Sequence, residues 1–130
     1  MDHLFALLHL AKENGLTNVF IHLITDGRDS PPQSAGDVIT RVEEKIKTLG
    51  IGKIASVVGR YFAMDRDRRW ERTEKAYKAL TQGSAITASS ALDAIKQSYE
   101  KSKTDEFLEP TTIVNEGKPL SLIKEGDTVI

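Results

Sequence analysis

Apolar and polar residues follow two different periodic patterns along the first two thirds of the chain. Apolar side chains recur every three or four positions in residues 2–14, 35–49 and 70–82, which predicts three amphipathic helices. Between them, residues 18–24 and 53–58 are nearly continuous runs of β-prone apolar residues. Such runs are typical of short strands that are covered on both faces.

The pattern weakens after Gly83. It predicts, in order, a helix from Ser89 or Ser90 to Tyr99, a loop over residues 104–110, a strand over 112–114, a turn over 115–118 and the beginning of a strand over 126–130. A natural chain rarely ends on rising hydrophobicity, so we expect a piece of a longer protein. Ser34 and Asp37 are expected to form a capping box for the second helix.

Helices that alternate with strands predict an α/β fold. We expect residues 1–130 to form a single three-layer domain, with a mostly parallel or mixed sheet flanked by helices. Two polar loops, residues 25–32 and 60–70, each follow a strand and precede a helix. Ligands of open α/β sheets bind at this position, the carboxyl ends of the strands.

Composition narrows the classes of function. A net charge of −1 gives no broad positive field for nucleic acid or an anionic membrane. The absence of cysteine excludes disulfides, a thiolate nucleophile and cysteine-ligated metal, and suits a reducing cytoplasm. The N-terminus lacks the features of a signal peptide, and no apolar run approaches the roughly 20 residues of a membrane helix. We expect a soluble, cytoplasmic protein.

The first polar loop contains Asp26-Gly27-Arg28-Asp29. The planar guanidinium of Arg28 matches the oxygens of a carboxylate or phosphate, and Asp29 can exchange a proton with a substrate hydroxyl. The alternative is an Asp-Gly turn with an ordinary surface ion pair.

The second polar loop is the more unusual one. Residues 59–72 hold five arginines and no lysine, a choice that favours bidentate recognition of anions over a merely solvated face. Arg60 and Arg66 flank an apolar insert, residues 61–64, which should anchor the loop and let the two arginines project. The remaining arginines are expected to pair with neighbouring acids or to face solvent: Arg68, Arg69 and Arg72.

Two further side chains have ordinary structural interpretations. Trp70 is expected to pack in the core, and His22 to be a core histidine with a hydrogen-bond partner rather than a site residue. The chain contains no P-loop, His-Glu-x-x-His or Gly-x-Ser-x-Gly motif. The sequence therefore predicts a domain that binds and orients an anion but has no nucleophile or metal cluster of its own.

Three motifs together resemble one enzyme family. The tetrapeptide at residues 26–29, the twelve residues Gly-Arg-Tyr-Phe-Ala-Met-Asp-Arg-Asp-Arg-Arg-Trp at 59–70 and Thr-Asp-Glu-Phe at 104–107 are similar to the cofactor-independent (2,3-bisphosphoglycerate-independent) phosphoglycerate mutases, in order and spacing. The twelve-residue motif is highly specific, whereas the tetrapeptide is not. The resemblance covers essentially the whole chain.

The resemblance implies a two-domain isomerase of glycolysis and gluconeogenesis that interconverts 3-phosphoglycerate and 2-phosphoglycerate without bisphosphoglycerate. One domain resembles alkaline phosphatase, holds two manganese ions and supplies a serine that becomes phosphorylated. This chain is similar to the other, inserted substrate-binding domain, which lacks the metal ligands, so the fragment alone is expected to bind no metal and to be inactive. Its implied substrate contacts are Arg28, Asp29, Arg60 and Arg66, with Asp29 as the catalytic proton shuttle.

The match has departures and rivals. Phe62 stands where tyrosine is common, and Ser30 where threonine or an apolar residue is usual. The family's substrate-contacting histidine and its Asn-Phe-Arg-x-x-Arg arginines are expected outside this chain. The main alternative function is a non-catalytic sensor module for phosphate or carboxylate; RNA binding is disfavoured because the net charge is close to zero.

Overall fold

A computed structural model describes all 130 residues. Helices alternate with strands through residue 100, except that two helices, α3 and α4, follow β2. The order is α1 (Asp2–Glu13), β1 (Phe20–Thr25), α2 (Ala35–Leu49), β2 (Lys53–Gly59), α3 (Arg60–Ala63), α4 (Trp70–Thr81), β3 (Ile86–Ala88) and α5 (Ala91–Glu100). The remaining elements are the 3₁₀ turn η1 (Asp105–Phe107), β4 (Thr111–Asn115) and β5 (Lys118–Pro119). The predicted α/β fold is confirmed. No helix combines the length and the hydrophobicity needed to span a bilayer.

The sheet is mixed, as expected. Its strand order is β1-β2-β4-β3, with β5 paired to β4. β1 and β2 are parallel, β3 and β4 are parallel, and β2 and β4 run antiparallel. Since β1 and β2 share a direction, both polar loops leave the same edge of the sheet, where Thr25 is the register partner of Gly59.

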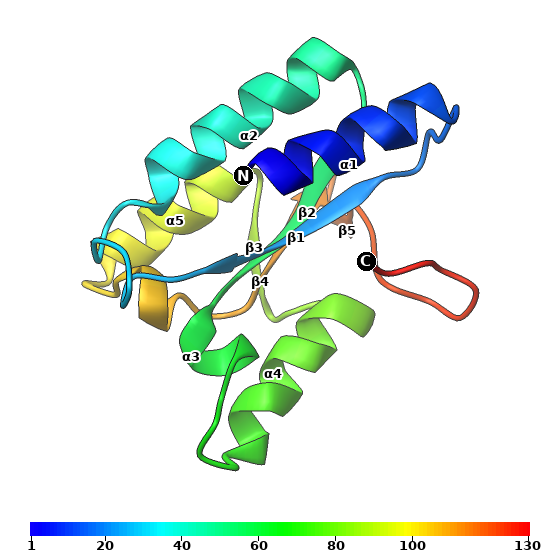
Figure 1. Ribbon diagram of the computed structural model, residues 1–130. Coiled ribbons are helices and arrows are strands. Elements are labelled where there is room, and N and C mark those ends of the chain that lie inside the picture. Colours follow the sequence, from blue (N-terminus) through cyan, green and yellow to red (C-terminus); the bar gives the residue numbers. More distant parts are fainter.

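Helices cover the sheet on two sides (Figure 1). α1, α2 and α5 lie over one face, and α3 and α4 lie on the other. The main core of 15 buried residues includes Leu8, Ile39, Val42, Val57 and Ile95. Burying side chains of this size contributes roughly 1.5–3 kcal/mol each. A smaller cluster of Val58, Phe62 and Ala76 joins α3 and α4 to β2.

The expectation of a strand beginning at residues 126–130 was wrong. These residues form no strand, and Val129 and Ile130 are 69% and 97% exposed. β-prone side chains alone do not make a strand, because a strand also needs a partner for its backbone groups. The strand expected near residues 112–114 is β4, and the loop expected over residues 104–110 contains η1.

Trp70 is not a core residue, contrary to the prediction. Its exposed fraction is 71%. α4 turns its small residues Ala76 and Ala79 inward, and both are buried. At about 100° per residue, Trp70 lies roughly half a turn around the helix from Ala79, so it faces solvent. The small side chains of these alanines allow α4 to pack close to the sheet, so the helix turns this face inward.

His22 has the hydrogen-bond partner that was expected, although it is only partly buried. Its Nδ1 atom lies 2.8 Å from the Ser56 hydroxyl oxygen on the neighbouring strand. Burial lowers the pKa of His22 below its ordinary value of 6.5. The fold therefore favours the neutral imidazole.

This shift predicts a pH dependence of stability. As pH falls below 6.5, the ordinary pKa of histidine, His22 takes up a proton in the unfolded chain before it does so in the folded one. The stability that neutral His22 contributes is therefore complete above that pH, and it is lost as pH falls toward the lower pKa of His22 in the folded state. His22→Gln should flatten the decline in the urea midpoint between about pH 7 and pH 5. An unchanged slope in urea titrations would show that His22 does not cause the decline.

Candidate functional site

The two polar loops meet on the turn η1. Gly27 has a φ of +64°, and a Cβ atom there would lie 2.6 Å from the Glu106 backbone nitrogen. A Cβ atom on Gly59 would collide with the backbone oxygens of Asp105 and Glu106. The backbone of η1 therefore packs directly against both glycines, and a side chain at either position would separate the loops from it.

Asp105, which is 1% exposed, caps α2 from a distant part of the sequence. Its Oδ2 atom accepts hydrogen bonds from the backbone N–H groups of Ser34 at 2.8 Å and Ala35 at 2.9 Å. The capping box predicted for Ser34 and Asp37 was wrong: the Ser34 hydroxyl donates to the carbonyl of Pro31 instead. A buried carboxylate satisfies two N-terminal amides of the helix at once, which the local side chains do not.

The other oxygen of Asp105 accepts a hydrogen bond from the Tyr99 hydroxyl at 2.5 Å. Burial and this carboxylate raise the pKa of Tyr99 well above its usual value, so the phenol remains a donor. The backbone of Asp105 is used as well: its N–H donates to Pro32 at 2.9 Å, and its carbonyl accepts from the Thr25 hydroxyl at 2.6 Å. One residue thus fixes the end of β1 and both the loop and the helix after it.

Arg60 begins α3 and lies between two carboxylates of the first loop. Its Nη1 atom donates to Asp29 at 2.7 Å and also to Asp26. These hydrogen bonds raise the pKa of Arg60, and Arg60 in turn lowers the pKa of Asp26. The Arg60 side chain is 11% exposed. Every buried side-chain nitrogen and oxygen atom in the protein has a hydrogen-bond partner. The Nε and Nη2 groups of Arg60 have no such partner, so they reach solvent.

Of the four predicted contacts, the structure brings Asp29 and Arg60 together. Arg28 and Arg66 are exposed and form no ion pair. Arg28 is on the same loop as Asp29, and Arg66 is on the loop that follows Arg60. Each of the two loops therefore carries one exposed arginine that forms no ion pair. Convergence of all four on one ligand remains a prediction.

The rest of the arginine-rich segment is arranged largely as expected. Arg72 pairs with Asp65 at 3.1 Å and with Asp67 at 3.9 Å. Arg68 and Arg69 are exposed. The apolar insert is anchored through Phe62, which is buried, but Met64 is 51% exposed.

Phe62 and Ser30, the departures from the family pattern, both have local roles. Phe62 packs against Val58 and Ala76, so it fills space and needs no hydroxyl. The Ser30 hydroxyl accepts a hydrogen bond from the Gly27 N–H at 3.1 Å and steadies the turn. An apolar side chain at position 30 would leave that N–H without this partner.

Sequence reasoning missed Asp26, Asp105 and Tyr99. Asp26 had a visible signal, since an Asp at the start of an Asp-x-x-Asp turn commonly accepts a backbone hydrogen bond, as it does from Asp29 at 3.3 Å. Asp105 and Tyr99 lie more than 60 residues along the chain from the loop that they support. No local pattern could reveal that contact.

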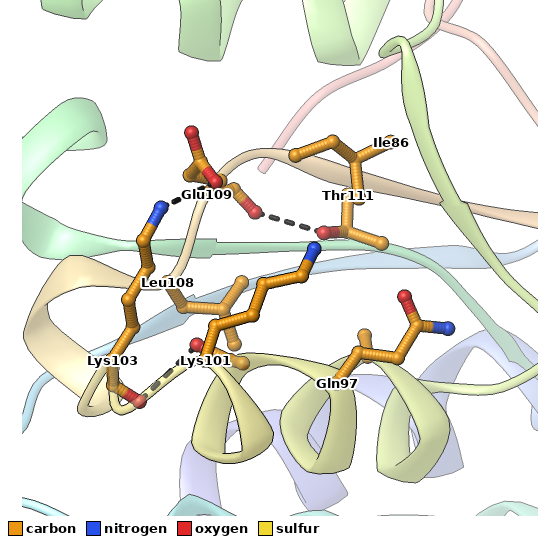
Figure 2. A pocket seen from close by; sticks show the side chains of 9 residues that line it. Ile86, Gln97, Lys101, Lys103, Leu108, Glu109 and Thr111 are labelled. Carbon is orange, nitrogen blue, oxygen red and sulfur yellow. Dashed lines mark hydrogen bonds and ion pairs between the residues drawn. The ribbon is translucent and has the colours of Figure 1, made fainter.

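Two hollows in the surface lie away from this site. One, of about 20 Å³, lies between α5 and the strands β3 and β4; its lining includes Gln97, Lys101 and the Lys103–Glu109 ion pair (Figure 2). That volume holds about one water molecule, so it cannot take a metabolite. The other, of about 280 Å³, lies at the amino end of β2 near Lys53. Neither includes Arg60 or the loop after β1.

The chain offers no fitting site for a divalent metal. No three His, Cys, Asp or Glu side chains gather in a way that could hold one. The carboxylate pairs that do converge are each occupied by a guanidinium: Asp26 and Asp29 by Arg60, and Asp65 and Asp67 by Arg72. The two manganese ions implied by the resemblance therefore have no ligand set among these residues.

Comparison with known proteins places this chain in a family. Residues 1–130 match the family described as BPG-independent PGAM N-terminus. The chain is 54% identical, over its full length, to the 2,3-bisphosphoglycerate-independent phosphoglycerate mutase of Moorella thermoacetica, and 54% identical over 129 residues to that of Clostridium kluyveri. It covers 25% of each of these proteins, so it spans about a quarter of their length.

A solved structure gives the same result. The chain superposes on Leishmania mexicana phosphoglycerate mutase, crystallised at low cobalt concentration, with a TM-score of 0.91 and 30% identity. The match covers 97% of this chain and 25% of that one.

The distant cap can be tested directly. Asp105→Ala should lower the free energy of unfolding by about 3–5 kcal/mol, because two helix amides and a buried phenol lose their acceptor. Asp37→Ala, which removes an exposed acid from the first turn of the same helix, should change it little. Urea unfolding of both variants is the measurement. Equal losses would mean that the Asp105 cap stabilises the start of α2 no more than Asp37 does, which would contradict its proposed role.

Proposed function

Because this chain belongs to the family of BPG-independent phosphoglycerate mutase N-termini, we propose that it forms the substrate-binding, phosphotransferase domain of such an enzyme. The enzyme would interconvert 3-phosphoglycerate and 2-phosphoglycerate in cytoplasmic glycolysis and gluconeogenesis. In it, a phosphatase-like domain of the same polypeptide would hold two manganese ions and the phosphorylated serine. The role of the present residues would be to bind glycerate and orient it for transfer.

The observation that carries this proposal is the set of contacts that Arg60 makes. It is held by Asp26 and Asp29 at the carboxyl edge of the sheet, with N–H groups still open to solvent. A phosphoglycerate brings a carboxylate and a phosphate, which together need several guanidinium donors. Arg28 and Arg66, exposed and unpaired, supply them from the two adjoining loops.

Asp29 is the best placed of the two carboxylates to move a proton. Its side chain is 78% exposed, whereas that of Asp26 is 37% exposed. Only Oδ2 of Asp29 contacts Arg60, so Oδ1 is free to accept a proton from a substrate hydroxyl. Asp26 is the poorer candidate because its Oδ1 already accepts hydrogen bonds from both Arg60 and the Asp29 N–H. Asp26 would hold Arg60 in place, and Asp29 would exchange a proton with a hydroxyl of the glycerate.

The positioning role explains why an anion-binding domain matters to a mutase. The glycerate must lose its phosphate, stay bound and offer its other hydroxyl. A held intermediate makes the second transfer effectively intramolecular, which can lower a barrier by several kcal/mol. Arginine suits this task because its charge is permanent and its planar fork fixes the orientation of a carboxylate.

The alternative of a non-catalytic sensor is not favoured. The relatives that cover this whole chain are named as phosphoglycerate mutases. A net charge of −1 likewise gives no support to a nucleic-acid partner.

The proposal is tested by separating catalysis from binding in the intact enzyme. Asp29→Asn keeps the size of the side chain but removes the base, so kcat should fall by about 10²–10⁴-fold with a small change in substrate affinity. Arg60→Lys should instead raise KM and let glycerate escape, which increases phosphatase activity relative to mutase activity. Steady-state kinetics and phosphoglycerate affinity measure both effects.

Asp93→Asn provides the control, since Asp93 is a partly buried acid in the first turn of α5, next to Ser89 near the amino end of β2 and away from both loops. It should leave kcat and KM unchanged. An Asp29→Asn enzyme that turns over near the wild-type rate would show that Asp29 positions substrate and does not move its proton.

A further inference from the structure

Asp65 is a nearly buried acid in the middle of an exposed, arginine-rich loop. Its side chain is 2% exposed, although its neighbours on both sides are exposed. Oδ2 accepts hydrogen bonds from the backbone N–H groups of Asp67 at 3.2 Å and Arg69 at 2.8 Å. The loop is therefore folded around this carboxylate, and Arg66 lies inside the folded segment.

The second oxygen of Asp65 connects the loop to both flanking helices. Oδ1 accepts a hydrogen bond from Nη1 of Arg72, on α4, at 3.1 Å. The Arg72 guanidinium lies 3.9 Å from the ring centre of Tyr61, on α3. Tyr61 in turn packs against Phe107 of η1, with 5.1 Å between ring centres. A chain of contacts thus runs from η1 through α3 and Arg72 to Asp65.

Arg66 gains a fixed backbone from these contacts but has no ion pair of its own. On one side of Arg66, the Asp65 carboxylate pairs with Arg72. On the other side, the Asp67 N–H donates to the same carboxylate. Arg68, two residues later, adopts a φ of +58°, a conformation that a non-glycine residue keeps only when its surroundings enforce it. The loop is consequently ordered before any ligand binds, while the Arg66 guanidinium remains available.

We propose that Asp65 and Arg72 are positioning residues for Arg66 in substrate binding. Neither touches the substrate; they remove the entropic cost of ordering the loop, which the substrate would otherwise meet on binding. The inference rests on the proposed function, because it takes Arg66 to be a phosphoglycerate contact. It adds that affinity depends on the ion pair between buried Asp65 and partly buried Arg72, neither of which contacts the ligand.

A purely structural role makes a different prediction. If Asp65 only starts α4, through the Arg69 N–H, its loss weakens the fold and affects kinetics equally whether or not Arg66 is present. If Asp65 positions Arg66, its loss has no further effect on substrate binding once the Arg66 side chain has been removed. A double-mutant cycle distinguishes the two.

The experiment uses the intact mutase with 3-phosphoglycerate as substrate. Asp65→Asn should raise KM about tenfold with kcat changed less than about threefold, and Arg66→Ala should raise KM at least as much. The Asp65→Asn/Arg66→Ala enzyme should have the KM of Arg66→Ala within about twofold. Glu74→Gln is the matched control: it breaks an exposed ion pair with Lys78 on α4 and should leave KM unchanged.

Arg72→Lys is the second variant, which keeps the positive charge but loses the planar stacking on Tyr61. It should raise KM as Asp65→Asn does, and only when Arg66 is present, so the test survives if Asp65→Asn fails to fold. If Asp65→Asn and Arg72→Lys raise KM by the same factor in both backgrounds, the positioning role is overturned while the proposed function stands. If Arg66→Ala itself leaves KM unchanged, the assignment of Arg66 to substrate fails, and this inference with it.

Discussion

The buried carboxylate of Asp105 is the contact on which the candidate site depends. Removing a carboxylate from water costs several kcal/mol, and three hydrogen bonds from the Ser34 and Ala35 amides and the Tyr99 hydroxyl offset that cost. The same residue binds the end of β1 and the end of the first loop through its backbone. The turn η1 is thereby held against the edge of the sheet from which both loops emerge.

That arrangement explains the two glycines and the paired charges. Gly27 and Gly59 let the loops approach the backbone of η1 without an intervening side chain. With the loops this close, Arg60 at the start of α3 reaches the carboxylates of Asp26 and Asp29. The two loops that leave this edge also carry Arg28 and Arg66, so the anion binding that we propose does not require a net positive charge on the whole protein.

The sequence predicted those features that local patterns determine. The first two helices and strands and both loops follow from hydrophobic periodicity and turn residues, and the arginine-rich motif indicated an anion as ligand. The cap of α2 was predicted wrongly, because its acceptor comes from 70 residues farther along the chain. Trp70 was misplaced because the distance between α4 and the sheet, which favours alanine at the contact, is a tertiary property that periodicity does not give.

A crystal structure of the full-length protein with 3-phosphoglycerate, beside one without it, tests the proposed substrate site most directly. We expect the carboxylate or phosphate of the ligand within hydrogen-bond distance of Arg60 and of at least one of Arg28 and Arg66. The Asp105 carboxylate should remain on the Ser34 and Ala35 amides in both structures. A ligand held elsewhere in this domain, with no contact to Arg60, would contradict the central claim that η1 assembles the substrate site.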